Sequence, residues 1–365
     1  MNAFRIAILF LAAPLLFAAN TLDIYFIDVD HGNAVLVVSP SGESMLLDSG
    51  PSGHFYTQRI LDTMQAAGVK QIDYFVVSHY HWDHFGTIAE LAGAVPVLNY
   101  VDHGPSAEHD RSPEFYRVWG ISKANPDYDR YVKTREKGNH IVAAAGDRIP
   151  VKGIDALVVT SAGHVLGKPL AGAGEPSPGC WMTPQRIENE VEDGQSVGVL
   201  LSFGKFRFID LGDLTWNISR RLFCPENKVG QVDLYMMSHH GLSIDREAQG
   251  DPLWSASSCT PAEVYGLHPR VAVLSAGEDY VGRLATPEAW QITRSSPGLE
   301  DIWELHNQAQ GGPRNNSDEK FIACDDVNDC KGGLWIKVSA HEDGSFSVTN
   351  KRNGFTKQYP ARSAR

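Results

Sequence analysis

His79-Tyr80-His81-Trp82-Asp83-His84 is the stretch that decides the fold, and it directly follows the apolar run Ile72-Asp73-Tyr74-Phe75-Val76-Val77-Ser78. The apolar run predicts a β-strand, and Gly86 leads into a predicted helix. Three imidazoles and one carboxylate are therefore concentrated in a single strand-end turn. These side chains are ligands that suit zinc and its first-row neighbours, and catalytic sites combine a few of them with an open position for water.

The spacing within this hexapeptide predicts two metal ions. Side chains at alternate positions of a strand-end loop point the same way, so His79 and His81 can share one ion. Asp83 and His84 follow one step further round the turn and can reach a second ion. A solvated polar loop is the alternative, and the clustering of imidazoles in so short a segment argues against it.

The composition is that of a folded, acidic protein. The chain has 365 residues, of which 42% are hydrophobic, and this is enough for one large or two ordinary domains. The formal net charge of -12 argues against a broad surface for duplex nucleic acid, because phosphate binding depends on clustered Lys and Arg. A small-molecule or phosphodiester substrate fits this charge better.

The N-terminus has the pattern of a targeting segment. Residues 1–19 combine Arg5 with an apolar stretch, residues 6–17, and end on small residues, which predicts a signal peptide. The apolar stretch is shorter than the roughly 20 residues that a membrane span needs, although an uncleaved anchor is the alternative. We therefore expect a periplasmic or secreted protein that contacts a membrane only if this segment is uncleaved.

The five cysteines fit an oxidising compartment. Cys324 and Cys330 bracket a short acidic loop and are the favoured disulfide. The spacing of the other three indicates no pairing, and an odd count leaves at least one thiol free or intermolecular.

The remaining pattern predicts one domain over residues 20–365. Hairpin strands are expected at both ends of the chain, with alternating strands and helices between them, which suggests two similar halves. Insertions are expected near residues 103–140, mostly helical, and near 163–195, a long loop that could cover a site. A C-terminal β-hairpin is expected near residues 333–350.

The order of several segments resembles the metallo-β-lactamase superfamily. These segments are Phe26 to Ala34 (FIDVDHGNA), Leu46 to Gly50 (LLDSG), SHYHWDHFG from Ser78, Asp210-Leu211-Gly212-Asp213 and Ser238-His239-His240-Gly241. More narrowly, residues 22–308 resemble the hydrolase domain of bacterial DNA-uptake (competence) channel proteins and its free-standing secreted relatives. The resemblance implies an α/β fold, a four-layer αβ/βα sandwich with a two-metal site at the sheet edges.

The resemblance also assigns roles by position. His79 and His81 match ligands of the first metal, and Asp213 matches a carboxylate that bridges both metals. The ligands matched to the second metal are Asp83, His84 and His239. The sequence does not decide between His239 and His240, and we choose His239 because it is nearer the strand end. Asp48 matches a residue that supports the histidine loop. The expected cofactors are two divalent ions, with Zn²⁺ preferred and Mn²⁺ as the alternative.

One departure from the superfamily pattern concerns the first metal. Members commonly supply a further histidine shortly before the bridging aspartate, and residues 189–196 contain none. The first metal would then bind loosely or take a ligand from elsewhere; His103 and His164 are candidates, although for each the ordinary loop histidine is the favoured interpretation. His306 follows a predicted strand at the place where related folds have a final active-site residue.

These features predict an exported metal-dependent hydrolase that uses a metal-bound hydroxide, most plausibly on a phosphodiester. Asp83 would orient the hydroxide, and protonated His239, His240 or His306 would donate a proton to the leaving group. A metal-dependent binding module with a degenerate site is one alternative, supported by the missing histidine. A lactone or β-lactam hydrolase is another, because the same chemistry serves all these substrates.

Overall fold

The computed structural model describes residues 21–119, 126–188, 190–243, 257–277, 285–307, 316–325, 330 and 334–362. The predicted signal peptide lies outside the described residues. The described helices are α1 (His54–Ala66), α2 (Trp82–Phe85), α3 (Ile88–Ala94), α4 (Pro113–Trp119), α5 (Pro126–Arg135), α6 (Trp216–Phe223), α8 (Pro261–Leu267) and α9 (Pro287–Arg294).

The strands form two large sheets. In the first half of the chain they are β1 (Leu22–Ile27), β2 (Val35–Val38), β3 (Ser44–Leu47), β4 (Ile72–Val76), β5 (Val97–Asp102), β6 (Asn139–Val142), β7 (Arg148–Ile149), β8 (Asp155–Ser161) and β9 (His164–Val165). In the second half they are β10 (Gly198–Phe203), β11 (Phe206–Asp210), β12 (Leu234–Met236), β13 (Val271–Leu274), β14 (Asp301–His306), β15 (Ile322–Cys324), β16 (Trp335–Ala340), β17 (Phe346–Asn350) and β18 (Thr356–Tyr359).

Strand order places the ends of many strands at one edge. The first sheet has the order β18-β17-β16-β1-β2-β3-β4-β5-β6, and the second has β15-β14-β13-β12-β11-β10-β8-β7, with β9 beside β8. Strands β3 to β6 run parallel, and so do β11 to β15. Because parallel strands end on the same side, loops from several strands of each sheet meet there.

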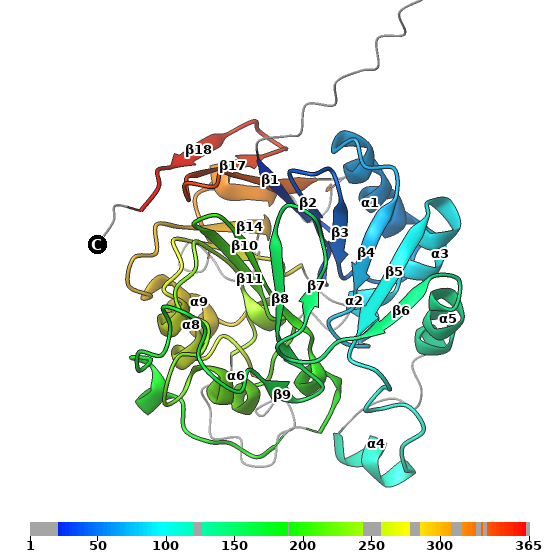
Figure 1. Cartoon of the computed structure of the whole chain (residues 1–365), viewed down its shortest axis with the longest axis horizontal. Helices are drawn as coiled ribbons and strands as arrows, with labels where there is room; N and C mark the ends of the chain where they lie inside the picture. Colours follow the sequence, from blue (N-terminus) through cyan, green and yellow to red (C-terminus); the bar gives the residue numbers. More distant parts are fainter. Residues whose placement is uncertain are drawn as a thin grey trace, which may run out of the picture.

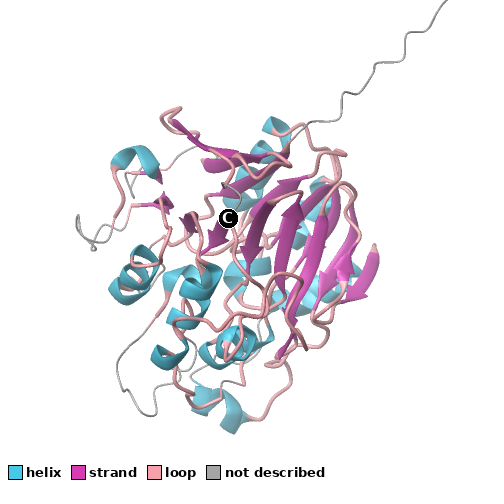
Figure 2. Ribbon diagram, turned by 60° about the vertical axis from the view of Figure 1, so that its left-hand side comes forward, coloured by secondary structure: helices cyan, strands magenta, loops and turns pink. Residues whose placement is uncertain are grey.

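Alternation along the strands explains the layers. In β1, Leu22, Ile24 and Phe26 pack into the core between the sheets, whereas Tyr25 and Ile27 pack against helices. Both faces of each sheet are therefore buried, as the two-residue period of a strand requires. Helices α1, α3 and α5 lie outside the first sheet, and α6, α8 and α9 lie outside the second (Figures 1 and 2). This confirms the predicted four-layer αβ/βα sandwich.

The C-terminal strands complete the first sheet. The predicted hairpin is present as β16 and β17, but its partner was not predicted: β16 pairs antiparallel with β1 along the whole length of that strand. Strand β18 extends the same edge. Its Tyr359 accepts a hydrogen bond from Trp303 Nε1 in β14 (3.0 Å), so the chain end also joins the two sheets.

The two segments expected as insertions differ in structure. Within residues 103–140, α5 packs on the first sheet through Tyr128 and Tyr131, whereas α4 projects from the body of the molecule (Figure 1). Residues 163–188 and 190–195 are mostly irregular, with β9 and short 3₁₀ turns. Among the described residues, no helix has the length and apolar character needed to cross a membrane.

The structure confirms the predicted disulfide and adds a second one. Cys324 pairs with Cys330, and Cys180 pairs with Cys224. Cys259 is buried and unbridged. Cys180 belongs to the long loop and Cys224 ends α6, so this second bridge fastens the loop to the helical layer of the second sheet.

Glu304 in β14 leads to a prediction about stability and pH. Its side chain is fully buried, and burial raises its pKa from about 4.5 to about 8. The folded state therefore holds this proton more tightly than the unfolded state, and stability should fall as the pH rises from about 4.5 to about 8. We expect Glu304→Gln to weaken this pH dependence in urea unfolding between pH 5 and pH 9. The exposed Glu136→Gln should unfold as the wild type does, and equal pH slopes for Glu304→Gln and wild type would contradict the prediction.

Candidate metal centre

The histidine loop is held in place by Asp48 at the end of β3. Its carboxylate accepts hydrogen bonds from the backbone N of Ser78 (2.8 Å), from Ser78 Oγ (2.7 Å) and from His84 Nδ1 (2.7 Å). Asp48 is buried, so these bonds are shielded from water. The expected supporting role of Asp48 agrees with this geometry, because such outer partners fix the orientation and tautomer of metal-binding imidazoles.

One group of donors contains His79, His81 and Asp193. His79 Nε2 lies 3.1 Å from His81 Nδ1 and 3.5 Å from Asp193 Oδ1, and His81 Nδ1 lies 2.8 Å from the same oxygen. Asp193 comes from a 3₁₀ turn, Glu192–Gln195, directly before β10. This turn falls within the segment that lacks the histidine of the superfamily pattern, so a carboxylate stands beside the two histidines.

A second group surrounds Asp83 and His84 at the start of α2. His84 Nε2 lies 3.2 Å from His240 Nε2, and His240 Nε2 lies 3.4 Å from Asp83 Oδ2. Both imidazoles are buried, and so is the carboxylate. His31, from the loop after β1, also approaches, with Nε2 3.4 Å from Asp83 Oδ2.

Asp213 lies between the two groups. Its Oδ2 is 3.8 Å from His79 Nε2, 3.3 Å from His84 Nε2, 3.4 Å from His239 Nε2 and 3.6 Å from His240 Nε2. Burial would raise the pKa of Asp213, but the positive charges of His239, His84 and His240 outweigh it and hold the pKa well below its usual range. One carboxylate oxygen is thus shared by histidines of both groups, as a bridging ligand would be.

The second group fits a bound cation because its ring nitrogens present lone pairs to one another. His240 Nδ1 faces the carbonyl oxygen of Ser275 (2.9 Å), which can only accept, so this nitrogen carries the proton. His84 Nδ1 likewise donates to Asp48. In the neutral rings, both Nε2 atoms are therefore acceptors, and they face each other and the carboxylate of Asp213. These lone pairs repel one another unless a proton or a metal ion binds between them.

The distances favour the metal ion. Ligand atoms about 2.0–2.1 Å from a tetrahedral zinc ion lie roughly 3.3–3.4 Å apart, whereas charge-assisted hydrogen bonds are about 2.7–2.9 Å long. The separations measured among Asp83, His84, Asp213 and His240 run from 3.2 to 4.0 Å. All of them are longer than charge-assisted hydrogen bonds, as is expected of ligand atoms arranged around a metal ion.

The first group fits a bound cation for a different reason, which is the buried carboxylate of Asp193. Asp193 Oδ1 is buried, with His81 Nδ1 at 2.8 Å and His79 Nε2 at 3.5 Å. A buried carboxylate is costly unless a cation, either a protonated imidazole or a metal ion, compensates its charge. The opposite ring nitrogen of His81 is held by Glu108, whose Oε1 lies 3.1 Å from Nε2, so that Nδ1 faces Asp193. The residues present therefore fit a second ion here.

The structure brings both His239 and His240 to the donor groups. His240, and not His239, faces Asp83 and His84, whereas His239 shares a group with Asp193 and Asp213. Both residues have a left-handed backbone, with φ of 50° and 51°, and this sharp turn directs the second ring inward. His240, which was expected as a proton donor, has its Nδ1 engaged by Ser275 and its Nε2 directed at the donor group.

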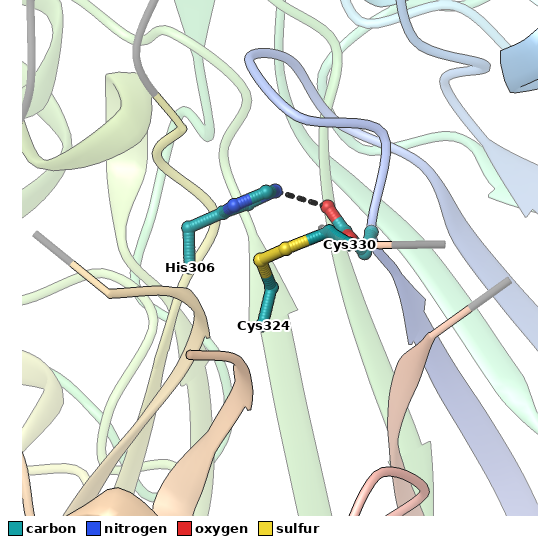
Figure 3. Close-up of side chains that lie close together, drawn as sticks. His306, Cys324 and Cys330 are labelled. Atoms are coloured by element: carbon teal, nitrogen blue, oxygen red, sulfur yellow. Dashed lines mark hydrogen bonds and ion pairs between the residues drawn. A yellow bond between two sulfur atoms is a disulfide. The ribbon is translucent and has the colours of Figure 1, made fainter. Parts of the chain in front are cut away.

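His306 lies in a different cluster. Its Nε2 hydrogen-bonds to the buried Asp28 and lies 3.5 Å from Asp30 Oδ1, and Arg59 contacts both aspartates. The ring also lies beside the Cys324–Cys330 disulfide (Figure 3). The described polar contacts of His306 are with Asp28 and Asp30, and its expected role as a catalytic acid stays a prediction.

The two histidines offered as replacements for the missing ligand also lie elsewhere. His103 Nε2 bonds to Glu192 Oε2 (3.0 Å), and His164 is exposed in β9. Glu192 further accepts bonds from the backbone N of Tyr80 (3.1 Å) and from Ser106 Oγ (2.6 Å). This buried carboxylate ties the histidine loop and residues 103–107 to the turn that carries Asp193.

Sequence reasoning missed Asp193, Glu192, Glu108 and His31. A signal for the first two was present, because Glu190, Glu192 and Asp193 form an acidic run where the superfamily pattern has a histidine. Glu108 and His31 belong to loops whose spacing gives no indication of their position. Only the pairing of strands and the packing of loops bring these two side chains to the site.

Comparison with known families identifies the fold. Residues 27–162 match the family model of the metallo-beta-lactamase superfamily. Over these residues, the chain is similar to that superfamily. A metallo-beta-lactamase fold binds divalent metals, and together with the His and Asp groups it supports a metal-dependent hydrolase. The narrower resemblance to competence proteins stays a prediction, and no curated protein matches the sequence.

Several solved structures are similar at low identity. CmlA, a diiron beta-hydroxylase from Streptomyces venezuelae, has 14% identity and a TM-score of 0.39, covering 69% of this chain and 44% of that chain. YhfI from Bacillus subtilis has 12% identity and a TM-score of 0.42, with 78% and 95% covered. MEM-A1, a subclass B3 metallo-beta-lactamase from a soil metagenome library, has 14% identity and a TM-score of 0.37, with 78% and 86% covered. The chain thus spans about half the length of the CmlA proteins, 52% in a second CmlA structure.

The first prediction for the site concerns Asp48. Asp48→Asn places an amide donor where the carboxylate accepts from Ser78 and His84, so the His84 ring should lose its fixed tautomer. We expect metal affinity to fall by roughly 10- to 100-fold, measured by competition with a chromogenic chelator. The control is Asp155→Asn, which changes an exposed aspartate of β8. Unchanged affinity in Asp48→Asn would show that this carboxylate does not support the metal site.

The second prediction separates the two ions. Asp193→Ala removes a donor from the first group and leaves Asp83, His84 and His240 in place, so elemental analysis should find about one ion per chain where the wild type holds two. Asp193→His, which restores the superfamily ligand type, should recover the second ion. Retention of two ions at wild-type affinity in Asp193→Ala would exclude Asp193 as a ligand.

Proposed function

We propose that this chain is an exported, binuclear metal-dependent hydrolase that acts on a phosphodiester. The observation that carries the proposal is the sharing of Asp213 Oδ2 between two groups of buried metal donors, one with Asp193 and one with Asp83. When bound, two divalent ions would supply Lewis acidity and activate a water for attack at near-neutral pH. Zn²⁺ suits the imidazoles, and Mn²⁺ suits the carboxylates.

The residues have separable roles in this proposal. His79, His81 and Asp193 would hold one ion, and His84, His240 and Asp83 the other, with Asp213 between them. Asp83 Oδ2 would also accept a hydrogen bond from the attacking water and so orient it. Asp48 and Glu108 would keep the rings of His84 and His81 in the tautomers that direct their free nitrogens at the ions.

A phosphodiester suits the charge of this site. Two divalent ions and the three carboxylates of Asp83, Asp193 and Asp213 leave one net positive charge, which complements the single negative charge of a phosphodiester. The resemblance of the N-terminal segments to the competence-type hydrolase domain points to the same substrate class. The net charge of -12 favours a small phosphodiester or a cell-surface component over long duplex nucleic acid.

Asp193 and the two disulfides support an exported enzyme over a binding module. The binding-module hypothesis rested on the missing histidine, and Asp193 now stands in that position, which supports an active site. The disulfides Cys180–Cys224 and Cys324–Cys330 support export, because structural disulfides persist in oxidising compartments.

The proposal is tested with purified protein, first by elemental analysis and then by hydrolysis of bis(4-nitrophenyl) phosphate with and without added Zn²⁺ or Mn²⁺. We expect about two ions per chain and metal-dependent turnover. Asp213→Asn should lower kcat by at least about a hundredfold, because it removes the shared ligand, and the exposed Asp155→Asn should not. Turnover of a chromogenic cephalosporin or a lactone without phosphodiesterase activity would overturn the substrate class, and absence of bound metal would overturn the enzyme.

A further inference from the structure

His31 belongs to no metal-ligand motif of the sequence, yet it reaches the metal centre. It lies in the loop that joins β1 to β2, and its ring centroid is 4.7 Å from that of His240. Its Nε2 is 3.4 Å from Asp83 Oδ2. The three ligand atoms of His31, Asp83 and His240 all lie within 4.8 Å of one another.

The backbone around His31 is closely fitted to the centre. Gly32 has a φ of 126°, and a Cβ there would lie 2.3 Å from the carbonyl oxygen of Asp83, so only glycine lets the loop pass this close. The same carbonyl accepts from the backbone N of Asn33 (3.2 Å), and Ser275 Oγ donates to the Gly32 carbonyl (2.7 Å). The loop is therefore fixed against both α2 and the end of β13.

The ring of His31 is oriented by a backbone carbonyl. Its Nδ1 lies 3.1 Å from the oxygen of Gly277, which can only accept, so Nδ1 must carry a proton. In the neutral ring, Nε2 then presents its lone pair toward Asp83. The ring also stacks on Trp82, with centroids 6.0 Å apart and planes 16° from parallel.

His240 has the same arrangement. Its Nδ1 donates to the carbonyl of Ser275, two residues before Gly277, and its Nε2 faces the same oxygen of Asp83 at the same distance of 3.4 Å. One segment after β13 thus orients two imidazoles toward one carboxylate. A carbonyl that accepts from the outer nitrogen is the usual partner of a metal-binding histidine.

We propose that His31 is a further ligand, through Nε2, of the ion held by Asp83, His84 and His240. This inference rests on the proposed two-metal site. The contact with Asp83 is longer than the about 2.7–2.9 Å of a charge-assisted hydrogen bond and matches the separation of roughly 3.3–3.4 Å between two ligands of one tetrahedral zinc ion. The ion at this position therefore has the imidazoles of His31, His84 and His240 within reach.

The test compares His31→Asn with wild type. The Asn amide can still donate to Gly277, as Nδ1 does, but nothing replaces Nε2. Metal-free protein is titrated with Zn²⁺ in competition with a chelator, and with Co²⁺ while the visible absorption is followed. We expect affinity for one of the two ions to fall at least about tenfold, with the other unchanged, and the Co²⁺ spectrum to change. The exposed His164→Asn serves as the matched control.

The outcomes are distinguishable. If His31→Asn binds both ions with wild-type affinity and the same Co²⁺ spectrum, while the wild type holds two ions and hydrolyses the phosphodiester, only the role of His31 is overturned. If the wild type binds no metal, the proposed function fails as well. If His31→Asn does not fold, wild-type protein with ¹⁵N-labelled imidazoles and ¹¹³Cd²⁺ decides the question: coupling between cadmium and His31 Nε2 supports the proposal, and its absence overturns it.

Discussion

The metal centre depends on the buried carboxylate of Asp48. A carboxylate can only accept hydrogen bonds, so every group around it must donate. It fixes the backbone of Ser78, and thereby His79, and it fixes the tautomer of His84. It also accepts from Asn33 Nδ2 (3.2 Å), which donates in addition to Asp210 Oδ2 in the second sheet (3.1 Å). The two sheets and the loop after β1 are therefore joined at one charged point directly beneath the metal donors.

This arrangement places two carboxylates near each other, at a free-energy cost. Burial and the charge of Asp48 raise the pKa of Asp210 to about 6. The backbone beyond Asp210 is equally constrained: Gly212 has a φ of 57°, and a Cβ there would lie 2.7 Å from Ser78 Cβ. A larger residue would push Asp213 away from the histidines. Such local conflicts are tolerated where several strand ends must bring ligands to one place.

The sequence predicted the parts of the centre that depend on local spacing. The alternation of His79 and His81 and the strand before them were sufficient, because both follow from the two-residue period of a strand. Asp193, Glu108 and His31 could not be found in this way, since their positions depend on contacts between distant loops. The pairing of β16 with β1 was missed for the same reason. The choice between His239 and His240 stays a prediction: a left-handed turn at both residues, which no local pattern indicated, brings both rings near Asp213.

The two halves of the centre differ in the loops that surround them. The half around Asp193 offers His79 and His81, with His239 beside Asp193 and Asp213, and it borders residues 103–110 through Glu192 and Glu108. The half around Asp83 offers His84 and His240, and the loop after β1 covers it with His31. On this argument, the substrate oxygen would approach the side of Asp193, and Asp83 would orient the attacking water from the other side. The loop at residues 103–110, tied to that side through Glu192 and Glu108, is then placed where it can contact the substrate.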